Sequence, residues 1–202
     1  MSPISAVLLA AGSANRMGRL KQLLPLGEKP LILHCLDMLI AAGIEEITVV
    51  LGPDHEKVET AIAGYPVKVV INGMPGSDMA ESIRAGFAAA DVHSTGLLIC
   101  LSDHPMVTAD TVKALIAAHL TDPSKVIIPV YGGRTGHPSL FPAAALKEIF
   151  CKGNLREIIS EDPDRVKRID VPDEGIVIDI DTEEDYESAV RKNREVLYGK
   201  GP

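Results

Sequence analysis

A basic stretch with two isolated glycines follows the first apolar run of the chain, in "LLAAGSANRMGRLKQLLPLG" (8–27). Small residues at its start allow backbone N–H groups to approach an anion closely, and Arg16 and Lys21 add full positive charges. The stretch lacks the GK[ST] ending of a P-loop, and Gly12 and Gly18 do not form the GxGxxG fingerprint of a dinucleotide site. A solvent-exposed connection is the plain alternative, but the length of the loop favours anion binding.

Aspartates in two later segments have the oxygen chemistry of a divalent metal site. Asp103 directly follows the apolar run of "LLICLSDHP", and Asp179 and Asp181 alternate in "VIDIDTEEDY", a pattern that would place both on one face of a strand. Asp181 or Thr182 can instead cap the terminal helix, so that one aspartate caps while the other binds metal. His104 is interpreted either as a ligand or acid, or as an ordinary loop residue.

The sequence lacks the familiar motifs of covalent and zinc catalysis. Its six histidines show no zinc-ligand spacing and no HExxH motif, and it contains no GxSxG nucleophile motif. What remains is a cationic loop together with carboxylates that can bind a metal ion. That combination is typical of phosphoryl or nucleotidyl transfer, in which positioning and charge neutralisation supply most of the catalysis.

The elements that must position these residues alternate between apolar runs and helical patterns over the first 120 residues. Pro30 and Gly43 bound the first helical pattern, Asp54 is the expected cap of the second, and Thr108 or Asp110 is the expected cap of the fourth. The alternation predicts right-handed βαβ crossovers and a parallel sheet with helices on both faces. The expected strands are 4–10, 46–52, 67–72 and 96–103, and the expected helices are 30–43, 54–64, 77–90 and 108–120.

Beyond residue 125 the pattern is less regular, but it still predicts strands and helices of one α/β domain over residues 1–202. In open parallel sheets, ligands bind outside the carboxyl ends of the strands. Three polar loops that follow strands, at 11–21, 72–79 and 102–105, therefore point to one crevice. The later expected elements are strands 125–130, 137–141 (a candidate antiparallel strand), 166–171 and 176–181, short helices 143–150 and 154–160, and a terminal helix from 182.

Composition narrows the class of partner. A net charge of −8 and an aromatic content of 3% without Trp argue against a polyanion-binding surface and against base-stacking platforms, so we expect no nucleic-acid partner. The three cysteines form no CxxC motif, and Cys35 and Cys100 lie in apolar runs, which indicates a reducing, cytoplasmic environment. The apolar run at the N-terminus is short and no basic region precedes it, so we expect neither a signal peptide nor a membrane span.

Four segments resemble motifs of the MobA-like nucleotidyltransferases, and most closely those of the molybdenum cofactor cytidylyltransferase branch. "LAAGSANRMGRLKQLLPLG" resembles the family's L-A-A-G-x-S-x-R-M-G-x-x-K signature, and "LSDHPMV" resembles its L-x-D-x-P segment. "GGRTGHPSLF" is similar to G-x-x-G-H-P-x-L-F, which points to the cytidylyltransferase branch, and "DIDTEEDY" is similar to D-I-D-T-P-E-D. The resemblance extends over nearly the whole chain.

This resemblance implies a Rossmann-like, three-layer α/β/α sandwich with a mostly parallel sheet. It implies that Arg16 and Lys21 neutralise a triphosphate and that Asp103, with Asp181 or Asp179, holds Mg²⁺, with Mn²⁺ as a substitute. The remaining nucleotide-binding residues implied are Leu9, Ala10, Ala11, Gly12, Ser13 and Ser82, and the acceptor-side residues are Gly136, His137, Pro138 and Arg156.

The activity implied is transfer of CMP from CTP to the terminal phosphate of molybdopterin, with release of pyrophosphate. The family's G-D-x-G-x-R segment is "KGNLREI" here, with Asn154 in place of Asp and a shorter spacing, so the acceptor stays open. The alternatives are a transferase that uses GTP or a sugar phosphate, and a non-catalytic module that binds nucleotide or pterin and delivers it to a molybdoenzyme, in the manner of a chaperone. The single-glycine "AAG" opening favours cytidine on resemblance.

Overall fold

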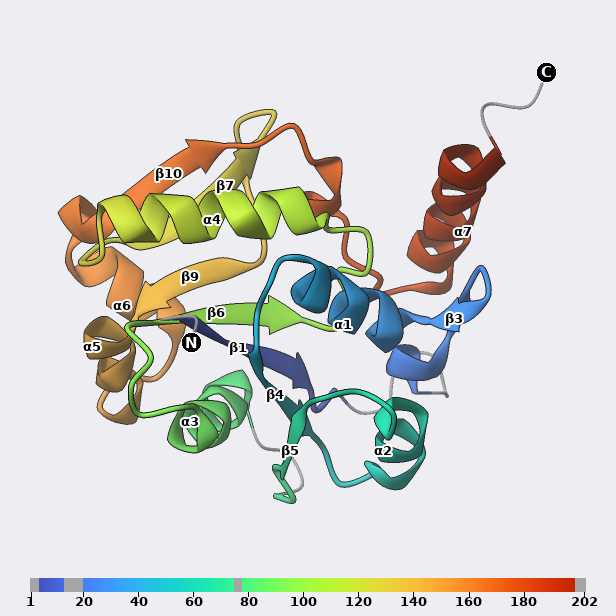
Figure 1. The fold of residues 1–202 in the computed structure, drawn as a ribbon, viewed down its shortest axis with the longest axis horizontal. Coiled ribbons are helices and arrows are strands. Elements are labelled where there is room, and N and C mark those ends of the chain that lie inside the picture. The colour runs from blue at the N-terminus through green and yellow to red at the C-terminus, as the bar shows by residue number, and fades with distance from the viewer. Residues whose placement is uncertain (1–3, 13–19, 75–77, 199–202) are drawn as a thin grey trace.

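A central sheet of eight strands forms the middle layer of the protein. The computed structural model describes residues 4–12, 20–74 and 78–198 (Figure 1). The strand order is β10-β7-β9-β6-β1-β4-β5, with β8 paired to β7. Neighbours are parallel except at β9, which runs antiparallel to β6 and β7, and at β8. The strands are β1 (Ile4–Ala10), β4 (Glu46–Leu51), β5 (Lys68–Ile71), β6 (Gly96–Leu101), β7 (Val126–Tyr131), β8 (Arg134–Thr135), β9 (Ser139–Pro142) and β10 (Val166–Asp170).

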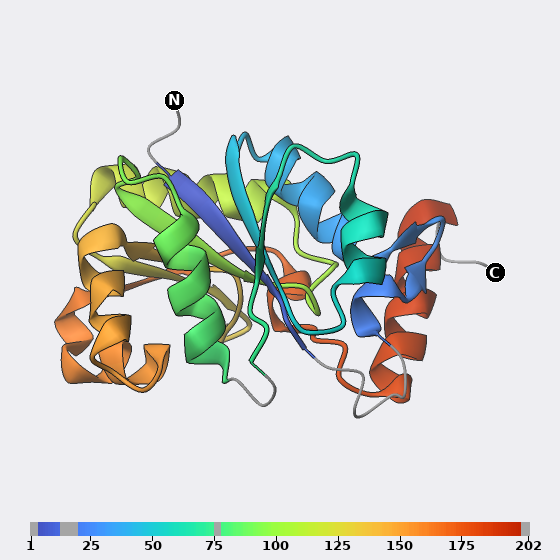
Figure 2. The same ribbon diagram turned by 90° about the horizontal axis from the view of Figure 1, so that it is seen from below.

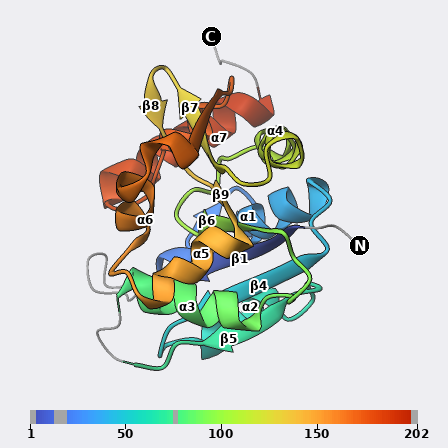
Figure 3. The ribbon, with the colours of Figure 1, turned by 90° about the vertical axis from the view of Figure 1, so that its left-hand side faces the viewer.

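Helices cover both faces of this sheet, as the alternating pattern predicted (Figure 3). All seven residues of β1 are buried between β4 and β6, and its side chains alternate between two hydrophobic clusters. On one face Leu8 packs in a cluster with α1 (Leu31–Ala41), α2 (Glu56–Ile62) and α4 (Ala109–Thr121). On the other face Val7 packs with α3 (Met79–Ala89), α5 (Ala143–Leu146) and α6 (Leu155–Glu161). The expected three-layer α/β/α sandwich is confirmed.

The C-terminal helix α7 (Glu183–Tyr198) lies outside these layers, beside a small hairpin (Figure 2). The hairpin consists of β2 (Pro25–Leu26) and β3 (Lys29–Pro30), which follow the short 3₁₀ helix η1 (Lys21–Leu23). Ile180, Ala189 and Leu26 pack in a third hydrophobic cluster that joins α7 to the hairpin. None of the helices in the described ranges is both long and apolar enough to cross a bilayer.

The expected strand at 176–181 is wrong. Residues Glu174–Val177 form the 3₁₀ helix η4, and irregular backbone follows. Asp173 starts this helix by accepting a hydrogen bond from the Gly175 N–H at 2.9 Å. The alternating apolar residues that suggested a strand are buried separately. Ile176 packs in the hydrophobic cluster that includes α1, α2 and α4, and Ile180 packs in the cluster that joins α7 to the hairpin. The period-2 pattern therefore reflects burial of a loop, and Asp179 and Asp181 do not share a strand face.

Three helix caps can be compared with the sequence. Asp54 does not cap α2, which begins after His55 with no side-chain cap. Thr108 caps α4 by accepting from the Thr111 N–H, which decides between the two residues considered. Thr182 caps α7 in a reciprocal box, because its hydroxyl accepts from the Asp185 N–H while the Asp185 carboxylate accepts from the Thr182 N–H. Asp181 joins these contacts through its backbone N–H, which donates to the same Asp185 carboxylate.

At Gly86, α3 lies very close to β1. A Cβ atom at this position would lie 2.3 Å from Cγ1 of Val7. We expect Gly86→Val to destabilise the protein by about 2 kcal/mol or more, because it overpacks a filled core and adds a β-branched residue to a helix. Urea unfolding measures the change in the free energy of unfolding. Gly64→Val is the matched control, since nothing lies within 4 Å of its Cβ position, and equal effects of the two substitutions would contradict this packing.

Candidate active site

A cavity of about 860 Å³ opens at the carboxyl ends of β1 and β6. Residues from all three loops expected to form one crevice line it, so that expectation is confirmed. Ala10 and Pro138 adjoin the lining residues in the chain without lining the cavity themselves, and Ser13 and Arg16 lie outside the described residues. The sequence-predicted residues that line it are Leu9, Ala11, Gly12, Lys21, Ser82, Asp103, Gly136, His137, Arg156, Asp179 and Asp181.

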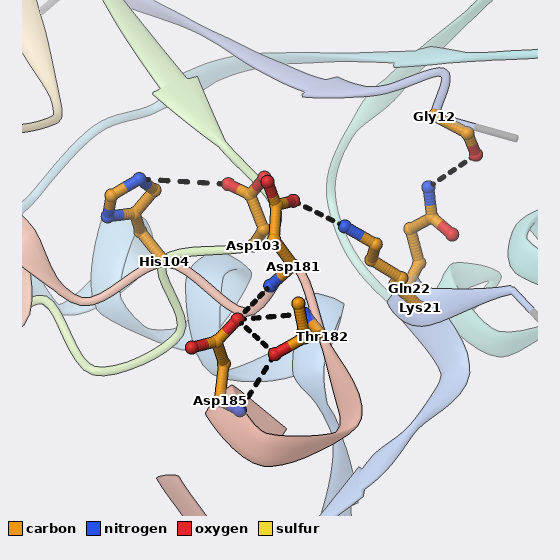
Figure 4. Close-up of polar contacts among 8 residues, drawn as sticks. All are labelled: Gly12, Lys21, Gln22, Asp103, His104, Asp181, Thr182 and Asp185. Atoms are coloured by element: carbon orange, nitrogen blue, oxygen red, sulfur yellow. Dashed lines mark hydrogen bonds and ion pairs between the residues drawn. The ribbon is translucent and has the colours of Figure 1, made fainter. Parts of the chain in front are cut away.

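An ion pair between Lys21 and Asp181 crosses one side of this cavity (Figure 4). The Lys21 Nζ donates to Asp181 Oδ1 at 2.5 Å, and the side chain of Lys21 is only 19% exposed. Next to this pair, the Ile180 N–H donates to the carbonyl oxygen of Asp103 at 3.0 Å. Three segments that are distant in the sequence, the end of the first loop, the end of β6 and the turn before α7, therefore meet here.

The Asp103 carboxylate is held in an environment that disfavours its charge. Burial raises its pKa above the usual range and the charge of Asp181 raises it further, whereas His104 and Lys21 act in the opposite direction. Asp103 Oδ1 is buried and has no hydrogen-bond partner among the described residues; His104 Nε2 lies 3.8 Å from it. A carboxylate oxygen without a hydrogen-bond partner, next to a second carboxylate, is suited to bind a cation.

The donor set suits a hard divalent cation that shares its ligands with a substrate. Within the described ranges, no three His, Cys, Asp or Glu side chains are close enough together to enclose a metal ion. Asp179 lines the same cavity, and its charge raises the pKa of His137, while the charge of Asp181 raises the pKa of Asp103. Mg²⁺ is commonly bound by one or two carboxylates together with substrate phosphates and water, and Asp103 with Asp181 matches that pattern.

Two amide side chains that the sequence did not single out also shape the cavity. Gln22 is 3% exposed, and its Nε2 donates to the carbonyl oxygens of Ala10 and Gly12. Asn72, at the end of β5, donates through Nδ2 to Oγ of the buried Ser82 at 3.0 Å. Neither amide belongs to a recognisable sequence motif, and only the contacts in the folded protein show which groups the two side chains position.

Gly136 and His137 also line the cavity, and Pro138 adjoins them in the chain. A Cβ on Gly136 would lie 2.1 Å from the carbonyl oxygen of Ile176, and the same oxygen accepts a hydrogen bond from the His137 N–H at 2.9 Å. Only glycine fits this contact, which holds Gly136 and His137 against η4. The His137–Pro138 peptide bond is cis, and the His137 ring lies 5.4 Å from the His104 ring between centroids.

Burial lowers the pKa of His137 to about 4; the nearby His104 also lowers it, whereas Asp179 raises it. His137 is therefore neutral at pH 7, and its buried Nδ1 has no hydrogen-bond partner among the described residues.

Arg156 of α6 also lines the cavity. Asn154, the residue that departs from the family's acceptor segment, caps α6 by accepting from the Glu157 N–H at 3.1 Å. Asn154 thus has a structural task at the start of the helix that carries Arg156.

Comparison with known proteins places the chain. The family described as "MobA-like NTP transferase domain" matches residues 6–165, which is more than half of the chain. The protein belongs to this family. The resemblance at the level of the family is confirmed, whereas the cytidylyltransferase branch stays a prediction.

Two kinds of relative are similar in sequence. Nicotine blue oxidoreductase of Paenarthrobacter nicotinovorans is 30% identical over 193 residues, covering 90% of this chain and 93% of that protein. The bifunctional protein GlmU of Halorhodospira halophila is 35% identical over 125 residues, covering 57% of this chain and 24% of that protein. The matches to GlmU proteins thus span about a quarter of those longer chains.

Solved structures share the fold over nearly the full length. Rv0371c of Mycobacterium tuberculosis H37Rv superposes with a TM-score of 0.82 at 27% identity, covering 93% of this chain and 97% of that one. A nucleotidyl transferase from Methanothermobacter thermautotroptrophicus gives a TM-score of 0.85 at 26% identity, covering 96% and 98%. A further structure of Rv0371c, with a TM-score of 0.72 and 26% identity over 93% and 97%, is a complex with manganese.

The neutral His137 makes stability depend on pH. An unfolded histidine has a pKa of about 6.5, so between that value and about 4 the unfolded state binds more protons than the folded state. The contribution of His137 to the free energy of unfolding is therefore complete above pH 6.5 and is lost as the pH falls toward 4.

Urea unfolding of the wild type and His137→Gln at pH 7 and pH 5 tests this. The wild type should lose more stability than the variant on acidification. The exposed His93→Gln serves as the control and should follow the wild type. A His137→Gln variant whose pH dependence matches that of the wild type would contradict the burial of a neutral ring.

Proposed function

We propose that this protein, as a single MobA-like domain over residues 1–202, transfers CMP from CTP to the terminal phosphate of molybdopterin and releases pyrophosphate. One observation carries the proposal: the Lys21 ammonium pairs with the Asp181 carboxylate beside Asp103 in a cavity at the end of β1. An ammonium suits phosphate oxygens, and the carboxylates suit a divalent cation. We place the reaction in the cytoplasm, in keeping with the buried free thiols of Cys35 and Cys100.

The nucleotide half of the cavity is assigned to the first loop and α3. We assign contacts with the base and ribose to the Leu9–Gly12 segment and to Ser82, whose hydroxyl accepts a hydrogen bond from Asn72 and can donate its own proton to the ligand. The Lys21 ammonium would offset charge on the triphosphate. Ser13 and Arg16 keep the roles that the sequence motif implies, Ser13 in nucleotide binding and Arg16 in offsetting the triphosphate charge.

Mg²⁺, or Mn²⁺ in its place, would be held by Asp103 and Asp181, and when bound it neutralises phosphate charge. In the absence of substrate, Asp181 Oδ1 accepts from Lys21, so the ammonium keeps the second carboxylate partly neutralised. Asp179, which the sequence offered as an alternative ligand, is assigned instead to the environment of His137.

The reaction needs no general base from the protein. An oxygen of the acceptor's terminal phosphate attacks the α-phosphorus of CTP, a new P–O bond forms, and the bond to the β-phosphate oxygen breaks to release pyrophosphate. The attacking phosphate is already ionised at neutral pH. The protein's task is to hold the two substrates in line and to offset their combined negative charge.

We assign the acceptor half of the cavity to Gly136, His137 and Arg156, which line it, and to the adjoining Pro138. Arg156 supplies a positive charge for the acceptor phosphate, and the neutral His137 ring supplies a hydrogen-bonding edge without adding charge. The matches to GlmU proteins keep a sugar phosphate open as an alternative acceptor, and GTP open as an alternative donor.

A second candidate function comes from the relative that matches along nearly its whole length, which is named an oxidoreductase. On that account the same loop would hold the phosphates of a dinucleotide and the cavity would hold a ring that accepts the hydride and is reduced. The paired acidic residues beside Lys21 favour transfer over hydride chemistry, because hydride transfer needs no such cation site. Assays for pyrophosphate release and for NADH or NADPH oxidation separate the two functions.

The deciding experiment is a nucleotide panel assayed for pyrophosphate release with molybdopterin as the acceptor. We expect CTP with Mg²⁺ to give turnover well above that with GTP, ATP or UTP. Turnover with GTP alone, or with a sugar phosphate in place of molybdopterin, would instead identify the protein as the alternative transferase. Tight binding of CTP without turnover on any acceptor would favour the non-catalytic delivery module.

The cation assignment predicts a separation of activity from stability at Asp103. Asp103→Asn keeps the shape and removes the charge, so pyrophosphate release should fall at least about 100-fold. The thermal midpoint should stay level or rise, because burial disfavours the carboxylate in the native state. Asp110→Asn, at a side chain that is 92% exposed, is the matched control for loss of an aspartate and should change neither quantity. Full activity of Asp103→Asn would overturn the cation assignment.

A further inference from the structure

Gln22 is a buried polar residue in the cavity wall that the proposed chemistry does not use. It follows Lys21 in η1 and is 3% exposed. Its carboxamide nitrogen donates to the carbonyl oxygen of Ala10 at 2.9 Å and to that of Gly12 at 3.0 Å. A single side chain therefore joins η1 to the end of β1, across ten to twelve residues of chain.

The orientation of this amide is fixed by its partners. Both contacts are carbonyl oxygens, which only accept hydrogen bonds, so the nitrogen must face them. The amide oxygen is then turned away, and it is buried without a partner among the described residues. A buried unpaired acceptor costs free energy that an apolar side chain of the same length would avoid. Packing alone therefore does not account for a glutamine here.

The turn that Gln22 holds is also confined by the end of β4. Gly52, just after β4, lies so close that a Cβ there would be 2.7 Å from the carbonyl oxygen of Ala11. The backbone from Ala10 to Gly12 is thus held between Gln22 and the end of β4. Figure 4 shows the Gln22 amide directed to Gly12 while the neighbouring Lys21 side chain extends toward Asp181.

We propose that Gln22 is a positioning residue for the triphosphate. By tying η1 to the end of β1, it sets the backbone of Ala11 and Gly12 and the Lys21 ammonium at one fixed spacing in the cavity wall. The inference rests on the proposed function, because it names the residue that prepares that same nucleotide site. Gln22 acts through these neighbours and touches no reacting atom.

Two substitutions of similar length separate the donor from the shape of the side chain. Gln22→Met removes both hydrogen bonds and the unpaired oxygen together. Gln22→Glu keeps the shape but turns a carboxylate oxygen toward two carbonyl oxygens. The probes are CTP with Mg²⁺, and Mg²⁺ with tripolyphosphate as a probe without base or ribose, each titrated calorimetrically in the absence of acceptor.

We expect Gln22→Met to raise the dissociation constants of both probes about tenfold, and Gln22→Glu to raise them more. The KM for CTP should rise by the same factor as the dissociation constant, while kcat and the KM for the acceptor stay within about twofold of wild type. The thermal midpoint of Gln22→Met should fall, because the carbonyl oxygens of Ala10 and Gly12 lose their donor and the removal of one unpaired oxygen offsets only part of that cost.

Ser5→Ala is the matched control, because it removes a buried hydrogen bond to Ser94 at the other end of β1. It should lower the thermal midpoint and leave both dissociation constants unchanged. A Gln22→Met variant that binds CTP as the wild type does would overturn the inference and leave the proposed function intact. A wild type that binds neither probe would overturn the proposed function, and the inference with it.

Discussion

The Lys21–Asp181 ion pair and the adjacent hydrogen bond from Ile180 to Asp103 join segments that are far apart in the chain. Lys21 follows the first loop, Asp103 follows the central strand β6, and the turn at Ile180 and Asp181 leads into the last helix. Without these contacts, two carboxylates would have no reason to share a partly buried crevice, because they repel each other. The ammonium offsets that repulsion, and the remaining imbalance is seen in the raised pKa of Asp103.

The sheet supplies the rigidity that such a charge arrangement needs. β1 is buried along its whole length and pairs on both sides with parallel strands, so the turn that follows it starts from a fixed point. Gly86 lets α3 approach β1 closely, and α3 in turn carries Ser82 into the cavity. The chemistry is placed on loops, but each loop leaves a strand or enters a helix that is packed in the core.

The sheet and its helices could be predicted because their signals are local. A continuous apolar run such as 4–10 has the length and β-branching of a buried strand, and the helices between such runs have amphipathic spacing and recognisable ends. Residues 176–181 were misread for a physical reason. Ile176 and Ile180 are buried in different clusters, and their backbone bonds to His137 and Asp103 rather than to a neighbouring strand. Alternation alone does not distinguish this from a strand.

Lys21 and Asp103 could also be anticipated, since each lies in a loop that follows a strand ending at one edge of the sheet, whereas Asp181 follows η4 and was anticipated from a strand that the structure does not contain. Gln22 and Asn72 could not, because each acts through a contact with a residue ten or more positions away. Asn154 was read only as a departure from a motif, and its role as the cap of α6 depends on where that helix begins.

The central claim is that Asp103 and Asp181 hold a divalent cation jointly with a triphosphate rather than by themselves. Titration of the protein with Mn²⁺, followed by electron paramagnetic resonance with and without CTP, tests this directly. The account predicts weak binding of Mn²⁺ alone, binding strengthened at least about tenfold by CTP, and loss of that gain in Asp103→Asn. Tight Mn²⁺ binding that CTP does not change, or a gain that survives in Asp103→Asn, would contradict it.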